Sequence, residues 1–211
     1  MDYVNQSNLI MIKNIVFDMG GVLIDFIWEK VYRERGLSGD VLDRVAKATV
    51  YSEQWVECDR DVLTHDEICD LFIKNDPSVE KEIRIAFHHM GEMIKKFPYS
   101  DEWVKSFKDK GYKVFILSNF SREAYYECGD NLSFTKYADG QIISCDHKLV
   151  KPDREIYEKL LSEYNLKADE CVFMDDVLKN VEGARRAGLH SFVFENVEDA
   201  KVKLRELGVD V

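Results

Sequence analysis

Short apolar runs alternate with stretches of helical periodicity along most of the chain. The runs are nearly continuous, which is typical of strands buried on both faces of a parallel sheet. A shorter fifth strand is predicted at residues 140–144. Because strands alternate with helices, the pattern predicts an α/β fold with right-handed crossovers. The four clearest runs cover residues 15–17, 113–118, 170–174 and 190–195.

Between these runs, apolar residues recur at helical spacing. They share one face of a predicted helix in residues 153–164, and residues 180–187 and 197–207 show similar patterns. Helices that connect parallel strands cover both faces of the sheet, so we expect a Rossmann-like, three-layer core. The apolar face of the first of these helices consists of Ile156, Tyr157, Leu160, Leu161 and Tyr164.

Residues 26–97 interrupt this alternation, because they contain no convincing strand and several helix starts. Thr64 and Glu67 are spaced as a capping box, and Pro77 suits the first turn of a helix. Recurring apolar residues predict one long helix over residues 78–97. We therefore predict an all-helical insert.

The insert follows the carboxyl end of the first strand, where open α/β sheets bind their ligands. We expect it to form a cap over that site. The predicted architecture is a Rossmann-like core of residues 1–25 and 98–211 with an all-helical cap of residues 26–97.

Composition agrees with a soluble domain that carries a modest insert. Of 211 residues, 45% are hydrophobic and 33% are charged. No stretch approaches the roughly 20 apolar residues of a membrane span, and the N-terminus lacks the pattern of a secretory signal. The first ten residues are expected to form a short extension or to precede an alternative start at Met11. Five cysteines without a CxxC pair indicate reduced thiols and a cytoplasmic location.

The net charge of −11 argues against nucleic acid or an anionic membrane as the main partner, because their phosphates would be repelled. A small phosphorylated metabolite stays compatible, since a few local basic groups can hold one phosphate. No heptad pattern indicates a specific assembly, so we expect a monomer or a weak homodimer.

Polar side chains gather at the carboxyl ends of the predicted strands. Each alone has an ordinary explanation, such as a turn former, a helix cap or a solvated charge. Together they place three carboxylates, one ammonium and a hydroxyl–amide pair at one edge. Crowded carboxylates repel each other unless a cation joins them, and oxygen ligands suit Mg²⁺. The set predicts a site for a metal ion and a phosphate, and it comprises Asp18, Ser118, Asn119, Lys151, Asp175 and Asp176.

The ordered motifs DMGGVL, LSN, KPDREIY and DDVLKN resemble the four motifs of the haloacid dehalogenase (HAD) superfamily. The resemblance covers essentially the whole chain, including a helical cap after the first motif. It is closest to the α-D-glucose-1-phosphate phosphatase-like group, whose first motif also has glycine two residues after the nucleophile. The segments CDRDVLTHDEI and NVEGARRAG add to that likeness.

The resemblance implies a phosphatase that works through a covalent intermediate. Asp18 would be the nucleophile and form an aspartyl-phosphate that water then hydrolyses. Lys151 would orient Asp18 and neutralise the phosphoryl group, to which Ser118 and Asn119 would donate hydrogen bonds.

The same resemblance implies a Mg²⁺ site. Asp18, Asp175 and the backbone carbonyl of Gly20 would bind the ion, which stabilises charge during transfer. Asp176 and Asn180 would lie behind them and orient a metal ligand and the lysine.

Gly20 departs from the wider superfamily, in which an aspartate at this position protonates the leaving oxygen and then activates water. General acid–base assistance is worth about 10²–10⁴-fold, so its absence affects poor leaving groups most. A sugar 1-phosphate loses a relatively acidic hydroxyl and would suffer less. Asp25, in a predicted turn, and His88 and His89, on the predicted long helix, were weighed as substitutes, and ordinary structural roles are favoured for all three.

The sequence therefore favours a Mg²⁺-dependent phosphatase of small phosphomonoesters, with sugar phosphates such as glucose 1-phosphate as candidates. One alternative is a catalytically weak protein that binds a phosphorylated ligand or partner, which Gly20 motivates. Another is a metal-free dehalogenase, against which the Asp175–Asp176 pair argues.

Overall fold

The computed structural model describes residues 11–211, so the predicted N-terminal extension lies outside the described residues. The predicted parallel sheet is confirmed, with five strands in the order β5-β4-β1-β6-β7. Phe17, the last residue of β1, pairs with Ile116 on one side and Met174 on the other, so the carboxyl ends of the three central strands lie close together. The strands are β1 (Asn14–Phe17), β4 (Lys113–Ser118), β5 (Gly140–Ile143), β6 (Cys171–Asp175) and β7 (His190–Val193).

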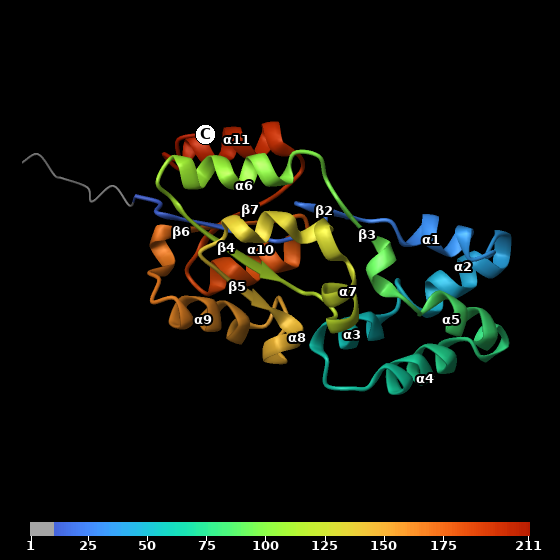
Figure 1. Cartoon of the computed structure of the whole chain (residues 1–211). Helices are drawn as coiled ribbons and strands as arrows, with labels where there is room; N and C mark the ends of the chain where they lie inside the picture. Colours follow the sequence, from blue (N-terminus) through green and yellow to red (C-terminus); the bar gives the residue numbers. More distant parts are fainter. Residues whose placement is uncertain (1–10) are drawn as a thin grey trace, which may run out of the picture.

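Helices cover both faces of this sheet and complete the predicted three layers (Figure 1). Alternate residues of one strand point to opposite faces: Phe17 packs in the cluster that contains Trp103 and Leu204, whereas Val16 packs in the cluster that contains Tyr157. One face is covered by α6 (Ser100–Asp109) and α11 (Val197–Glu206), and the other by α9 (Arg154–Glu163) and α10 (Leu178–Arg186).

The segment of residues 26–97, inserted between β1 and β4, is mostly helical and extends beyond the carboxyl ends of the strands (Figure 1). The predicted capping box is present, because Glu67 N donates to Thr64 Oγ1 and Thr64 N donates to Glu67 Oε2. Pro77 also takes its predicted place in the first turn of a short helix. The helices are α1 (Trp28–Glu34), α2 (Gly39–Ala48), α3 (Val56–Arg60), α4 (His65–Asn75) and α5 (Glu80–Ala86).

Two predictions for this segment are wrong. It is not purely helical, because β2 (Ile24–Phe26) pairs antiparallel with β3 (Ile94–Lys96) where the chain leaves and rejoins the core. Three-residue strands carry too little periodicity to be read from sequence. Asp25 therefore lies in a strand rather than a turn.

The long helix predicted over residues 78–97 is also broken. Only α5 is α-helical there, and it ends at Ala86. His89 then adopts a left-handed conformation with φ of 43° before the short 3-10 helix Met90–Met93. The recurring apolar residues are nevertheless buried as expected, including Phe87 and Met90. A short helix followed by a turn and a strand can bury the same apolar residues as one long helix. The spacing of these residues alone therefore could not distinguish the two structures.

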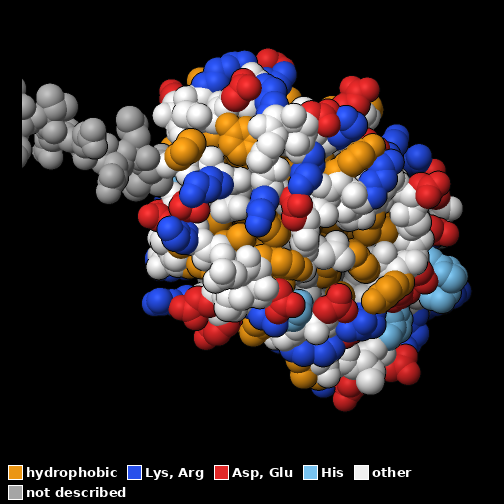
Figure 2. Space-filling view, turned by 60° about the vertical axis from the view of Figure 1, so that its left-hand side comes forward, with side chains coloured by type: hydrophobic (Ala, Val, Ile, Leu, Met, Phe, Trp, Pro, Cys, Tyr) orange, Lys and Arg blue, Asp and Glu red, His pale blue; other side chains and the backbone are white. Residues whose placement is uncertain are grey.

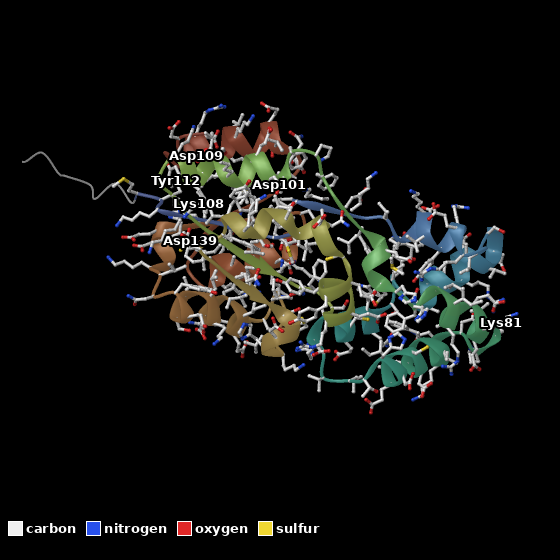
Figure 3. All side chains as sticks on the ribbon, in the orientation of Figure 1. Lys81, Asp101, Lys108, Asp109, Tyr112 and Asp139 are labelled. Carbon is white, nitrogen blue, oxygen red and sulfur yellow. The ribbon has the colours of Figure 1, made fainter. Side chains whose placement is uncertain are left out.

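Polar contacts also hold α6 against the amino ends of β4 and β5, at the edge of the sheet opposite the predicted site. Figure 3 labels Lys108 of α6 and Asp139 just before β5, which lie close together; Lys108 Nζ is 2.6 Å from both carboxylate oxygens. Asp139 also accepts a hydrogen bond from Val114 N of β4 at 2.7 Å. These contacts hold a surface helix against the two strands that lead to the site.

On the face shown in Figure 2, basic and acidic side chains are interspersed rather than gathered into an extended basic surface. Within residues 11–211, no helix combines the length and the apolar character that crossing a membrane requires.

The remaining short helices connect the strands to the site. α7 (Arg122–Glu127) follows β4, and Ser121 caps it by accepting a hydrogen bond from Ala124 N. α8 (Ser144–His147) follows β5 and precedes the loop that carries Lys151.

Candidate active site

Asp18 lies at the carboxyl end of β1 and is only 6% exposed. Its backbone N–H donates to Met174 O of the neighbouring strand at 3.0 Å, which fixes where the side chain starts. Its Oδ1 accepts a hydrogen bond from Ser118 Oγ at 2.7 Å and pairs with Lys151 Nζ at 2.7 Å. Within residues 11–211 its Oδ2 accepts no hydrogen bond, so one oxygen is held while the other stays available.

Lys151 is almost fully buried and bridges two carboxylates. Its Nζ lies 2.7 Å from Asp175 Oδ2 as well as 2.7 Å from Asp18 Oδ1. Asn119 holds the backbone of this residue, because its Oδ1 accepts from Lys151 N at 2.7 Å and its Nδ2 donates to Lys151 O at 3.1 Å. The Asn119 side chain is therefore engaged with the protein, and its predicted bond to a phosphoryl group stays a prediction.

The two acids that follow β6 differ sharply in their surroundings. Asp175 is fully buried, and its oxygens accept hydrogen bonds from Val177 N at 2.8 Å and from Asn180 Nδ2 at 3.1 Å. Asp176 is exposed and lines the cavity described below. The predicted roles, with Asp175 as a ligand of the metal ion and Asp176 orienting the site behind it, stay a prediction.

The two glycines after Asp18 are not equivalent. A Cβ added to Gly20 would meet nothing within 4 Å, so a side chain there would project into open space. Gly21 has a φ of +67°, and a Cβ there would lie 2.3 Å from Asp176 Oδ2. Gly21 is therefore required by local geometry, whereas Gly20 is not.

Burial and charge set the protonation of this cluster. Burial raises the pKa of Asp18 to about 7, with Lys151 opposing and Asp175 adding to the rise. Partial desolvation by its neighbours also raises the pKa of Asp176, although the residue is exposed overall, and the charge of Asp175 contributes. For Lys151, burial lowers the pKa, but the charges of Asp18 and Asp175 outweigh it, so the lysine is held in its charged form.

The donor set fits a hard divalent cation. Asp18, Asp175 and Asp176 each offer an oxygen within 4.8 Å of the others. Lys151 brings one positive charge to these three acids, and a cation beside Asp18 would favour its ionised form. Oxygen ligands at one open edge are typical of Mg²⁺ sites.

A cavity of about 730 Å³ opens above this cluster, between the sheet edge and the helical segment. Its floor includes Asp18, Gly20 and Lys151. The walls carry many apolar side chains, several of them aromatic. These wall residues include Phe26, Val50, Tyr51, Trp55, Val56, Met90, Ile94 and Phe120.

All eight residues singled out from the sequence thus converge on one edge of the sheet, whereas Asp25, His88 and His89 do not. Asp25 is exposed on β2 and does not line the cavity. His88 and His89 are both exposed, with ring centroids 3.9 Å apart, and they border a different surface hollow.

Sequence reasoning missed one acid, Asp59 of α3, which lines the cavity together with Asp18. Burial raises its pKa to about 7, and Lys151 opposes the rise. Its only signal in the sequence was its place in the segment CDRDVLTHDEI, where no particular residue stood out.

Residues 12–188 match the haloacid dehalogenase-like hydrolase family. The sesquiterpene phosphatase astK of Aspergillus oryzae is 24% identical over 195 residues, which cover 92% of this chain and 96% of that protein. The D-ribitol-5-phosphate phosphatase of Bacteroides thetaiotaomicron is 24% identical over 212 residues, with coverage of 92% and 97%. A HAD family enzyme of that bacterium, solved with magnesium and inorganic phosphate, shares the fold with a TM-score of 0.67 at 19% identity, over 87% of this chain and 94% of the other.

Proposed function

This chain belongs to the haloacid dehalogenase-like hydrolases, and we propose that it is a Mg²⁺-dependent phosphatase of small phosphomonoesters. The observation that carries the proposal is the buried Asp18 carboxylate, with one oxygen held by Ser118 and Lys151 and the other unbonded among residues 11–211. The phosphatases among the similar proteins, and the magnesium and phosphate bound by a structural neighbour, support it.

In the proposed reaction, Asp18 attacks phosphorus through its free oxygen and forms an aspartyl-phosphate as the alcohol leaves. Lys151 holds the other oxygen and places a positive charge beside the phosphoryl group. Ser118 hydrogen-bonds Asp18 in the resting site and is within reach of a phosphoryl oxygen once the acid has reacted. Water then attacks the same phosphorus and releases phosphate.

Asp18, the Gly20 carbonyl and one acid of the pair Asp175 and Asp176 would hold the magnesium ion. When bound, the ion offsets the repulsion between carboxylate and phosphate and stabilises charge at transfer. Because Asp175 is tied to Lys151 and Asn180, we assign the direct contact to Asp176 and the orientation of Lys151 to Asp175.

We propose that the helical segment of residues 26–97 acts as a cap that closes the cavity and selects the leaving group. Ser144 Oγ donates to Asp59 O at 2.6 Å, and Arg122 Nε donates to Asp61 Oδ2 at 2.8 Å, so α3 is docked onto the sheet edge. The apolar walls favour a leaving group with an apolar or planar surface over a bare sugar.

The test is phosphate release from a panel with Mg²⁺ or with EDTA. The panel contains glucose 1-phosphate, ribitol 5-phosphate, an isoprenoid phosphate and an aryl phosphate. We expect Mg²⁺-dependent turnover that Asp18→Asn abolishes, with the apolar substrates preferred. Turnover by Asp18→Asn equal to that of the natural chain would overturn the proposal.

Gly20 favours a second candidate, a protein that binds a phosphorylated ligand with little turnover. Tight binding of panel members without phosphate release, measured by calorimetry, would favour it. A kcat of the ordinary enzymatic order, about 1 s⁻¹ or more, would exclude it.

A further inference from the structure

Asp59 of α3 is an acidic residue of the cavity lining, and among the described residues its carboxylate has no partner. It lines the cavity together with Asp18, Gly20 and Lys151. Within residues 11–211 the carboxylate takes part in no hydrogen bond or ion pair, and its contact at hydrogen-bond distance is through its backbone carbonyl. An acid without a partner in a ligand cavity is free to engage what binds there.

The backbone near Asp59 is anchored to the core at two points, the carbonyl of Asp59 itself and the side chain of Asp61. Ser144 Oγ donates to Asp59 O at 2.6 Å and accepts from Phe120 N at 2.9 Å, which ties α3 to the loop after β4. Two residues later, Asp61 pairs with Arg122 and with Lys148. The position of Asp59 over the sheet edge is thus set by the fold rather than by its own side chain.

The charges around Asp59 do not neutralise it. Lys151 is the charged group that acts on it from the core, whereas Arg60 beside it pairs with Glu57 and Asp153. Burial is the larger influence and raises the pKa of Asp59 to about 7. A pKa near neutral pH allows a side chain both to give up a proton and to take one back, which suits a general acid–base catalyst.

The other acids of the cavity are less suited to proton transfer. Glu53 and Asp153 are exposed, and Asp153 pairs with Arg60. Asp18 and Asp176 belong to the metal cluster. At Gly20 there is open space and no side chain.

We propose that Asp59 is the general acid–base catalyst of this phosphatase, in the role that Gly20 cannot fill. The proposal rests on the phosphatase function proposed above. As the bond from phosphorus to the leaving oxygen breaks and the bond to Asp18 forms, protonated Asp59 donates its proton to that oxygen. Ionised Asp59 then takes a proton from water as its oxygen attacks phosphorus, which breaks the bond to Asp18 and releases phosphate.

The decisive measurement is the dependence on leaving group. Alkyl phosphates need a proton on the departing oxygen, whereas p-nitrophenyl phosphate does not. We expect Asp59→Asn to lower kcat/KM for alkyl phosphates by about 10²–10⁴-fold and for p-nitrophenyl phosphate by less than about tenfold. Retained aryl turnover also shows that the variant is folded.

A rescue and a control sharpen the result. Adding Gly20→Asp to Asp59→Asn places a carboxyl in the open space at residue 20 and is expected to restore at least part of the alkyl activity. Glu57→Gln changes a carboxylate on the same helix that does not line the cavity, so the alkyl-to-aryl ratio should stay unchanged.

The unmodified protein supplies an independent readout. Above pH about 7, Asp59 loses its proton, so the ratio of alkyl to aryl kcat/KM should fall as pH rises. Taking the ratio cancels the ionisation of Asp18, which both substrates require. This decline should be absent in Asp59→Asn.

The outcomes separate the two proposals. If Asp59→Asn leaves the alkyl-to-aryl ratio and its pH dependence unchanged, Asp59 is not the acid, although the phosphatase assignment stands. If neither substrate is hydrolysed by the natural chain, or Asp18→Asn hydrolyses them equally well, the phosphatase assignment itself fails.

Discussion

Lys151 and Asp18 form a 2.7 Å ion pair whose side chains are only 1% and 8% exposed. The partners are far apart in the chain and meet because Asp18 ends β1 while Asn119 clamps the Lys151 backbone. Such a pair would position the proposed nucleophile, and it leaves Asp18 and Asp175 with one ammonium group as their shared counter-charge. Catalysis and stability are therefore linked at this residue.

Replacing Lys151 by Met tests that link. Asp18 and Asp175 would be left buried side by side, and breaking a buried ion pair costs about 3–5 kcal/mol of unfolding free energy. The loss should be largest at pH 8 and shrink at pH 5, because a carboxylate whose pKa is raised takes up a proton as pH falls. Urea unfolding of both proteins at the two pH values measures it, and activity should fall as well.

Lys159→Met is the matched control. Lys159 pairs with Glu163 on the surface of α9, where an ion pair is worth about 0.3–0.5 kcal/mol. Equal losses of unfolding free energy in the two variants would show that the buried ion pair contributes no more to stability than a surface ion pair.

Gly20→Asp should be accepted by the fold, since a Cβ there meets nothing within 4 Å. We expect an unchanged melting temperature and a rise in kcat/KM for alkyl phosphates, which need an acid most. Gly21→Ala is the contrasting variant, because its Cβ would displace Asp176 and its φ is positive. It should lose stability and Mg²⁺ affinity, and a stable, fully active Gly21→Ala would contradict the geometry.

The acidic pair can be separated by metal titration. Asp176→Asn should weaken Mg²⁺ binding, measured by calorimetry, because Asp176 faces the cavity. Asp175→Asn should chiefly lower kcat and stability, because its oxygens contact Lys151, Asn180 and Val177 N. If Asp175→Asn alone abolished Mg²⁺ binding, the roles would be those that the sequence motif implied.

The cysteines should be inert in the native protein. All five are buried, and burial raises their pKa values, to about 11 for Cys128, Cys145 and Cys171. Thiolate is the reactive form, so an aromatic disulfide reagent at pH 8 should label fewer than one thiol per chain quickly. Unfolding in denaturant should expose five, and a smaller number would indicate a disulfide.

The sequence by itself determined the sheet, the helices that flank it and the polar edge. Apolar runs and helical periodicity are local properties, and the carboxyl ends of parallel strands must meet at one edge. Asp18, Ser118, Lys151 and Asp175 could therefore be grouped before any contact was known. Gly20 could likewise be recognised as a position where the wider superfamily has an aspartate and this chain has none.

Tertiary structure alone decided what lies over that edge. The β2–β3 pair forms between three-residue segments about 70 residues apart, and its stability comes from pairing rather than from local preference. The division between Asp175 and Asp176 depends on which carboxylate Lys151 reaches. Asp59 became a candidate only because Ser144, Arg122 and Lys148 dock its helix over the cavity. Such contacts join distant parts of the chain, and no local pattern encodes them.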